Sequence, residues 1–179
     1  TITRVLVHPS NPNIVLISSR EGIFKSIDGA KTWGKVFSTT TIKDMQFHPT
    51  NPSIIYASSM NFSGINGIYK STNSGDSWDL IHQVSSSLRT QIAVTPDAPN
   101  NVYLLSCAMH RGFLNFELST NEGNTFSEIA TQASVGNLLG WYNGTDYNKG
   151  QGTYDLAIAV NPKNKNEIYI GGVDIWKSL

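Results

Sequence analysis

The chain has 179 residues, of which 39% are hydrophobic and 15% charged, and its 13 Lys and Arg residues balance 13 Asp and Glu residues. These proportions are typical of a globular domain. A nucleic-acid-binding protein usually has a basic surplus or a cluster of Lys and Arg, and neither is present, so nucleic acid is not an expected partner. No apolar run approaches the roughly 18 residues of a membrane span, and residues 1–4 lack the layout of a signal peptide.

Two short motifs recur along the chain. A proline turn reads HPSNP at 8–12, HPTNP at 48–52, TPDAPN at 95–100 and NPKN at 161–164, with first prolines 40, 47 and 66 residues apart. An eight-residue motif, called here the box, reads SIDGAKTW at 26–33, STNSGDSW at 71–78 and STNEGNTF at 119–126, with starts 45 and 48 residues apart. Because both series share one period and one phase, the chain is built from structural repeats.

Each period predicts four short antiparallel strands. In the second period they lie at 42–47, 54–58, 67–70 and 78–81, separated by Pro, Asn, Gly and Ser turns. Four strands per repeat of this length predict an all-β fold, a β-propeller with four-stranded blades. In chain order we predict blade 1 at about 1–38, blade 2 at about 39–85, blade 3 at about 86–131, an insertion at 132–152 and an incomplete blade 4 at about 153–179. The apolar strand at 104–108 predicts a buried free thiol at Cys107.

The box is predicted to be structural. Its third position holds Asp or Asn, whose short side-chain oxygen can accept hydrogen bonds from turn N–H groups. Its fifth position favours glycine, for which a positive φ costs little. We expect the aromatic ring at the eighth position to be buried beneath the hairpin. The structural residues are Ser26, Asp28, Trp33, Ser71, Asn73, Gly75, Trp78, Ser119, Asn121, Gly123 and Phe126. A ligand or cation role for Asp28 is the alternative; no metal site and no cofactor are predicted.

The pattern S-x-D-x-G-x-[ST]-[WF] with the HPxNP turn resembles the Asp-box, or BNR-repeat, propellers over nearly the whole chain. That superfamily includes sialidases, xyloglucanases, sortilin-type receptors and a photosystem assembly factor. The first box departs from the pattern with Ala30 in place of glycine, and Gly29 is expected to relax the turn. Segments 150–160 and 168–178 are similar to secreted sortilin-like propellers of Bacteroidota, a resemblance that implies an extracellular or cell-surface bacterial protein.

Blade topology divides the loops between two faces. In an antiparallel blade with strands a to d, the a–b and c–d turns lie on one face, and the b–c loops and the crossovers to the next blade lie on the other. The proline turns and the boxes therefore share one face, the box face. The opposite face, the mouth face, receives the loops 20–21, 60–66, 110–111 and 172–174 and the crossovers 38–41, 85–88 and 131–152.

The longest crossover is the first candidate ligand site. Among its glycines it contains Trp141, Tyr142, Asp146 and Tyr147. Long loops on a rigid scaffold are often functional, and flat aromatic faces beside polar groups suit carbohydrate or peptide stacking. The alternative is a loop folded on its own aromatic residues.

The inner strands supply a second candidate site. Arg4 and Asp44 lie five residues before the first proline of their turns, and Arg89 and Asp155 lie seven before. These residues, with Asp174 from the loop 172–174, are candidates for one polar cluster at the mouth face. The alternative is that Arg4 and Asp44 only pair across adjacent blades.

Three functions fit these features. We favour a noncatalytic extracellular or cell-surface propeller that binds a glycan or a protein on the mouth face. The alternative is a glycoside hydrolase resembling the xyloglucanases, which needs two carboxylates about 5–5.5 Å apart for retention or about 6.5–9.5 Å apart for inversion. Asp44, Asp146, Asp155 and Asp174 are the candidates for that pair. A purely structural or assembly role is the third.

We also expect the propeller to be incomplete. Residues 168–170 and 175–177 are predicted strands b and c of the fourth blade, and Ser178 is the first position of a fourth box. A blade buries its apolar face only against a neighbour, so further blades of the parent chain, or a partner chain, are expected to cover the outermost blades. The start at Thr1 rather than Met fits a processed or excised piece.

Overall fold

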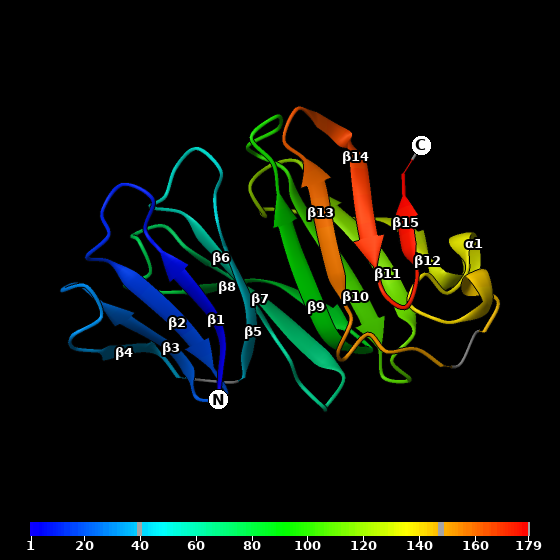
Figure 1. The fold of residues 1–179 in the computed structure, drawn as a ribbon, viewed down its shortest axis with the longest axis horizontal. Helices are drawn as coiled ribbons and strands as arrows, with labels where there is room; N and C mark the ends of the chain where they lie inside the picture. The colour runs from blue at the N-terminus through cyan, green and yellow to red at the C-terminus, as the bar shows by residue number, and fades with distance from the viewer. Residues whose placement is uncertain (39–40, 147–148, 179) are drawn as a thin grey trace.

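The structure is a computed structural model that describes residues 1–38, 41–146 and 149–178 (Figure 1). Within these ranges the chain forms three four-stranded antiparallel sheets and one three-stranded antiparallel sheet, each with its strands in chain order. The all-β prediction of four-stranded repeats is confirmed. No described helix is long and apolar enough to cross a membrane.

The strand bounds follow the repeats. The first sheet contains β1 (Ile2–Val7), β2 (Val15–Ser19), β3 (Gly22–Ser26) and β4 (Gly34–Phe37). The second contains β5 (Ile42–Phe47), β6 (Ile55–Ser59), β7 (Ile65–Ser71) and β8 (Asp79–Ser85). The third contains β9 (Ser87–Val94), β10 (Val102–Ala108), β11 (Phe113–Ser119) and β12 (Ser127–Thr131), and the last contains β13 (Ala157–Asn161), β14 (Asn164–Gly171) and β15 (Ile175–Lys177).

The four sheets lie side by side as the blades of a partial propeller. Their first strands β1, β5, β9 and β13 are successive neighbours, and Figure 1 shows each blade extending outward from this inner row. Three apolar clusters fill the gaps between consecutive blades. Leu16, Ile42 and Met45 belong to the first, Tyr56, Ile68 and Leu104 to the second, and Leu105, Phe113 and Leu139 to the third. Cys107 is fully buried in the third cluster, as predicted, and burial raises the pKa of its thiol to about 11.

The boxes form the hydrogen bonds expected of a structural turn. Oδ1 of Asn73 accepts from the N–H of Ser77 at 3.0 Å, and its Nδ2 donates to the Ser77 hydroxyl at 2.9 Å. Asn121 makes the same two bonds to Thr125. In the first box, Asp28 accepts from the N–H and the hydroxyl of Thr32, at 2.9 and 2.6 Å. These bonds lower the pKa of the Asp28 carboxyl from 3.8 to about 2, because they favour the charged form.

The fifth box position requires the left-handed backbone conformation in all three boxes. Gly75 has φ +87° and Gly123 has φ +85°. Ala30 has φ +71°, and Gly29 beside it has φ +73°. The fourth position also has a positive φ, at +57° for both Ser74 and Glu122. Gly29 therefore relaxes the fourth position of the first box, but the positive φ at the fifth still falls on Ala30.

The Trp78 and Phe126 rings pack between blades as well as against their own hairpins, where Nε1 of Trp78 donates to the carbonyl of Gly75 at 3.2 Å. The Trp78 ring lies 6.4 Å, between centroids, from Phe37 of the first blade, and the Phe126 ring stacks at 4.6 Å on His82 of the second. Each ring thus contacts the blade that precedes it in the chain. Trp33 has no preceding blade in this chain and is 39% exposed, so the expectation that its ring is buried is wrong.

A second contact between blades also uses the box. Lys25, directly before the first box, is largely buried and donates to Asp76 in the second box at 2.7 Å. Lys70, directly before the second box, donates to Glu122 in the third at 3.2 Å. Leu118 holds the equivalent position in the third blade and packs into the apolar cluster against the fourth. The second box is therefore tied by an ion pair to β3 of the first blade, and the third box to β7 of the second blade.

The insertion between the third and fourth blades is mostly irregular. It contains α1 (Gln132–Val135) and the 3-10 turn η1 (Tyr142–Gly144). Its centre is the fully buried Asn137, whose Oδ1 accepts from the N–H of Phe113 at 2.7 Å and whose Nδ2 donates to the carbonyls of Asp146 and Lys149. The insertion is held against the start of β11, which is the mouth-face end of that strand.

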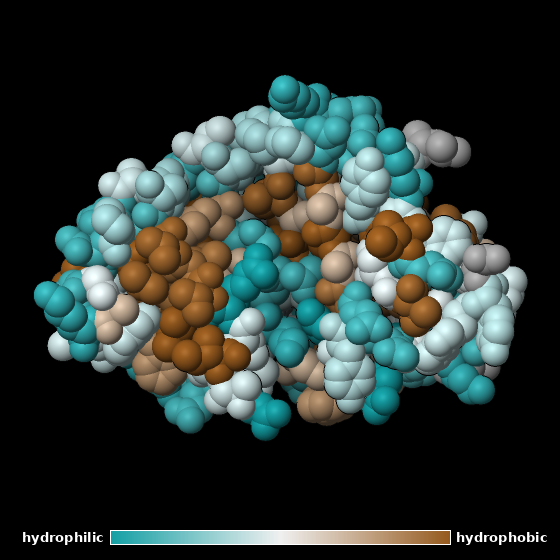
Figure 2. All heavy atoms as spheres, viewed as in Figure 1, coloured by the Kyte–Doolittle hydropathy of each residue, from teal (hydrophilic) through white to brown (hydrophobic). Residues whose placement is uncertain are grey.

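The outer surface of the first blade is apolar. Figure 2 shows hydrophobic atoms gathered over β1 and β2 on the side that faces the viewer. Ile2, Val5 and Val7 are each more than half exposed there. At the opposite end of the row of blades, Ile175 of β15 is 81% exposed.

Candidate functional site

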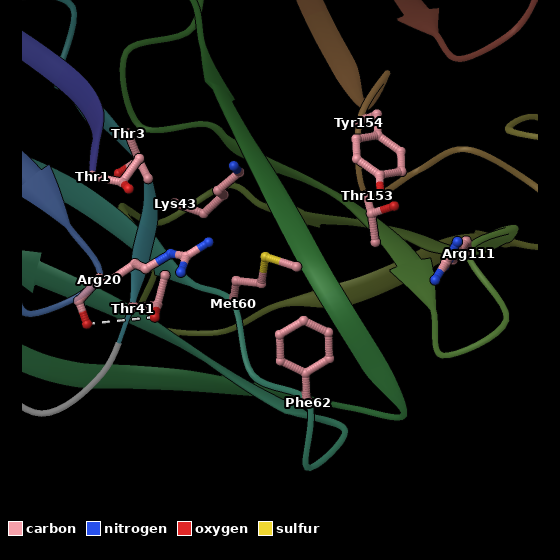
Figure 3. Close-up of a pocket in the computed structure, with 10 residues that line it drawn as sticks. All are labelled: Thr1, Thr3, Arg20, Thr41, Lys43, Met60, Phe62, Arg111, Thr153 and Tyr154. Carbon is pink, nitrogen blue, oxygen red and sulfur yellow. Dashed lines mark hydrogen bonds between the residues drawn. The ribbon is translucent and has the colours of Figure 1, made fainter.

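A cavity of about 490 Å³ opens at the mouth face, beside the first residues of the inner strands (Figure 3). The first blade lines it with Thr1, Thr3 and Arg20, and the second with Thr41, Lys43, Met60 and Phe62. Arg111 comes from the b–c loop of the third blade, and Thr153 and Tyr154 follow the insertion. Elements of every blade therefore meet at this cavity, which we call the mouth pocket.

Three cationic side chains line the mouth pocket. Figure 3 shows Arg20 and Lys43 extending into it from one side, with Arg111 on the other. Burial, together with repulsion from Arg89 and Arg20, lowers the pKa of Lys43. No Asp or Glu is among the described residues that line the pocket. It therefore presents positive charge and hydroxyl groups to a ligand.

Two aromatic rings flank the same pocket. Phe62, in the loop between β6 and β7, is 75% exposed, and Tyr154, before β13, is 74% exposed. Large apolar side chains with this exposure contribute little to folding stability, so two of them at one pocket point to a surface that binds a ligand. Both rings lie on the rim, where they can contact the flat face of a bound molecule.

The predicted pair of Arg4 and Asp44 forms across adjacent blades. Nε of Arg4 lies 3.4 Å from Oδ1 of Asp44, whose other oxygen accepts from the N–H of Ile92 in the third blade at 3.1 Å. The Asp44 side chain is only 1% exposed, and burial raises its pKa despite these partners. Asp44 thus links three successive inner strands, and the interpretation as a pair between blades is confirmed.

Arg89 is also occupied within the protein. Its guanidinium donates to the carbonyls of Thr153 at 3.0 Å and Tyr154 at 3.4 Å, and to the side chain of Gln91 at 3.0 Å. Only 8% of the residue is exposed. Arg89 therefore fixes the segment that carries Thr153 and Tyr154 at the rim of the pocket, and acts on a ligand only through these residues.

The remaining predicted ligand residues lie outside the mouth pocket. Trp141 and Asp146 are half-buried in the insertion, and Tyr142 is 78% exposed. Asp155 is exposed and Asp174 half-buried, and neither lines the pocket. Tyr147 lies outside the described residues. The insertion is held around Asn137 and not around its aromatic residues, and the ligand role of these residues stays a prediction.

The sequence reasoning placed the right loops on this face but chose other residues in them. Arg20, Phe62 and Arg111 fall in loops assigned to the mouth face, but the predicted ligand residues lie in the inner strands, the longest crossover and the loop 172–174. The positions of the arginines did indicate this face. Arg4 and Arg89 lie near the start of an inner strand, and Arg20 and Arg111 follow the second strand of their blade.

A metal ion finds no cluster of side-chain ligands in the described part of the chain. No group of three or more His, Cys, Asp or Glu side chains is arranged there to hold a metal ion. His48, part of a proline turn, accepts at Nδ1 from the N–H groups of Thr50 and Asn51, so this ring nitrogen is engaged in the turn.

Known protein structures share the fold of this chain. No family model and no curated protein sequence matches the chain. An ancestral GH74 enzyme is similar in structure, with a TM-score of 0.73 and 18% identity over 99% of this chain and 22% of its own. The fold they share is the β-propeller. The GH74 enzyme of Niastella koreensis has a TM-score of 0.68 at 20% identity, covering 93% of this chain and 24% of that one.

The GH74 xyloglucanase of Xanthomonas campestris is also similar, with a TM-score of 0.64 at 19% identity, over 98% of this chain and 29% of that one. The chain therefore spans less than a third of each of these enzymes. At such identities the likeness concerns the fold alone.

Proposed function

We propose that this chain is part of a noncatalytic propeller that binds a glycan in the mouth pocket. The observation that carries the proposal is a pocket of about 490 Å³ flanked by two exposed aromatic rings and lined by threonine hydroxyls and three cations. Rings can pack on the apolar face of a sugar, while hydroxyl and cationic groups hydrogen-bond to its oxygens. The three similar GH74 enzymes, one of them named a xyloglucanase, support a polysaccharide as the ligand.

Two features favour binding over hydrolysis. Glycoside hydrolysis generally uses a pair of carboxylates that face the scissile bond. The described residues that line the mouth pocket include no carboxylate, and Asp44, one of the predicted candidates, is buried against Arg4 and a backbone N–H. A GH74-like hydrolase remains the second candidate because of the structural likeness.

We further propose an extracellular or cell-surface location and membership of the Asp-box propellers, on the basis of the three boxes. The apolar outer surface formed by Ile2, Val5 and Val7 supports coverage of the first blade by a further blade or a partner chain. Exposed apolar area of this kind is costly unless a neighbour covers it.

The test is glycan binding by the protein and by ring-deletion variants. We expect a glycan array followed by calorimetry to identify a ligand, and Phe62→Ala and Tyr154→Ala each to weaken its binding about tenfold. Trp33→Ala is the matched control, because this ring is exposed on the box face, and it should leave affinity unchanged. Equal loss in all three variants, or release of reducing sugar from the bound glycan, would contradict a noncatalytic mouth-pocket site.

A further inference from the structure

We infer that the mouth pocket selects a glycan that carries an anionic group, a carboxylate or a sulfate. The inference rests on the proposed glycan-binding function and names the class of ligand for the same site. Two observations support it: Arg20, Lys43 and Arg111 line one pocket, and their side chains form no ion pair with another described residue.

The arginines of the chain divide into two pairs. All four lie at the mouth face, but Arg4 pairs with Asp44, and Arg89 donates to backbone carbonyls. Arg20 and Arg111 are exposed. Neither of their side chains, nor that of Lys43, makes a hydrogen bond or an ion pair with another described residue. Internal partners thus satisfy one pair of arginines, and the other pair is presented to the pocket together with a lysine.

The neighbouring carboxylates lie outside the lining of the pocket. Glu21 follows Arg20 in the chain and Asp155 follows Tyr154, but neither lines the pocket. Burial lowers the pKa of Lys43, and the charges of Arg89 and Arg20 lower it further, so like charges lie close together here. A bound anion would relieve this repulsion, and a neutral sugar would not.

Arg111 adds an independent observation. Its φ is +71°, a left-handed conformation that a residue with a Cβ adopts less readily than glycine. Two backbone hydrogen bonds hold the loop, from the N–H of Arg111 to the carbonyl of Ala108 at 2.8 Å and from the N–H of Gly152 to the carbonyl of Arg111 at 2.9 Å. Both bonds use backbone groups alone, so they do not require the arginine side chain, which lines the pocket.

The flanking rings favour an acidic sugar over another anion. Phe62 and Tyr154 offer apolar faces on the rim, and Thr41 and Thr153 offer hydroxyl groups inside it. A small inorganic anion would use the cations alone. An anionic pyranose uses both, with the charged group against Arg20, Lys43 or Arg111 and the ring against an aromatic side chain.

The experiment compares three oligosaccharides by isothermal titration calorimetry with the full chain. An oligogalacturonate provides carboxylates, a heparin tetrasaccharide provides sulfates, and a xyloglucan oligosaccharide is neutral. We expect one of the acidic sugars to bind at least about tenfold more tightly than the neutral sugar, and its affinity to fall as NaCl is raised. The better acidic sugar identifies the anionic group.

Single substitutions test which cations of the mouth pocket contact the anionic group of the sugar. Arg20→Gln and Lys43→Gln should each weaken binding of the acidic sugar about fivefold or more, and should weaken binding of the neutral sugar by a smaller factor, because the loss of charge matters only for the anion. Lys163→Gln is the matched control, because this exposed lysine lies in a proline turn on the box face. Arg111→Gly should weaken binding while raising the melting temperature, since it removes both the charge and the strain.

The outcomes separate the two proposals. Tighter binding of the neutral sugar, with loss of affinity in Phe62→Ala, would overturn the anionic preference and leave the glycan-binding function standing. Binding of none of the sugars, together with binding of a poly-glutamate peptide, would overturn both in favour of an acidic protein partner. Unchanged affinity in Arg111→Gly would remove Arg111 from the site.

Discussion

The fifth position of the box can be tested by replacing glycine with alanine in one box and alanine with glycine in another. Gly75→Ala places a Cβ at a residue with φ +87°, against Cδ2 of the fully buried Leu16. The left-handed conformation costs alanine about 1–2 kcal/mol. Overpacking adds about 1–3 kcal/mol, and the lower entropy of unfolded alanine returns about 0.4–1 kcal/mol. We therefore expect a loss of about 2–4 kcal/mol in the free energy of unfolding.

Ala30→Gly is the reverse change at the equivalent position. Ala30 is exposed and has φ +71°, so glycine relieves strain without leaving a cavity. The relief of about 1–2 kcal/mol exceeds the entropy cost of glycine, which leaves a gain of about 0.5–1 kcal/mol. Gly123→Ala serves as a replicate of the first change, because its Cβ would lie 2.6 Å from Cδ1 of Ile81.

The assay is urea unfolding followed by circular dichroism and tryptophan fluorescence. The midpoint and slope give the free energy of unfolding for each variant, and equal slopes show that the unfolded state is comparable. A Gly75→Ala protein within about 0.5 kcal/mol of the parent would refute the reasoning. So would a destabilised Ala30→Gly protein, because the strain at the fifth position would then not exist.

Two further predictions concern the same motif. Trp78→Ala should cost about 3 kcal/mol, since burial of a ring removes about 150–250 Å² from water at about 25 cal/mol/Å² and this ring is only partly buried. Trp33→Ala should cost under about 1 kcal/mol, and equal losses in urea unfolding would contradict packing between blades. Asp28 has a pKa of about 2 in the fold against 3.8 ordinarily, so its charge stabilises the protein above pH 3.8 and this contribution is lost as pH falls toward 2. Asp28→Asn introduces the residue found at Asn73, and its melting temperature should fall less than that of the parent protein between pH 3.8 and about 2. Equal falls in the two proteins would show that the Asp28 charge does not stabilise the fold.

The contacts between blades give these predictions a common basis. Box residues reach the preceding blade through the Trp78 and Phe126 rings and through the ion pairs that Asp76 and Glu122 form with buried lysines. A box therefore stabilises the packing of two blades as well as its own hairpin. This explains why Trp33 is exposed although its box has the same hydrogen bonds as the others.

The sequence by itself determined the repeat, the strands and the two faces. Turn motifs and boxes recur with one period, and each strand pairs with its neighbour along the chain, so local pattern is enough to place them. The bounds of β5 were predicted to the residue, whereas β7 and β8 extend beyond their apolar cores, because backbone pairing continues to Ile65 and Ser85 where side-chain pattern ends. The hydrogen bonds within each box join residues at most four positions apart, so the sequence also predicts them.

Only the tertiary structure decided which residues share a site. Arg20, Lys43 and Arg111 stand on different blades, and their approach depends on how the sheets pack, which no local pattern encodes. The same holds for charge. The sequence assigns Arg4 and Arg89 to inner strands and Arg20 and Arg111 to loops, but it does not show which of them have partners. The partners of Arg4 and Arg89 are Asp44 and the carbonyls before β13, which lie far away in the chain. Whether a cation binds a ligand or the protein itself is set by these long-range neighbours, because electrostatic compensation acts through space and not along the chain.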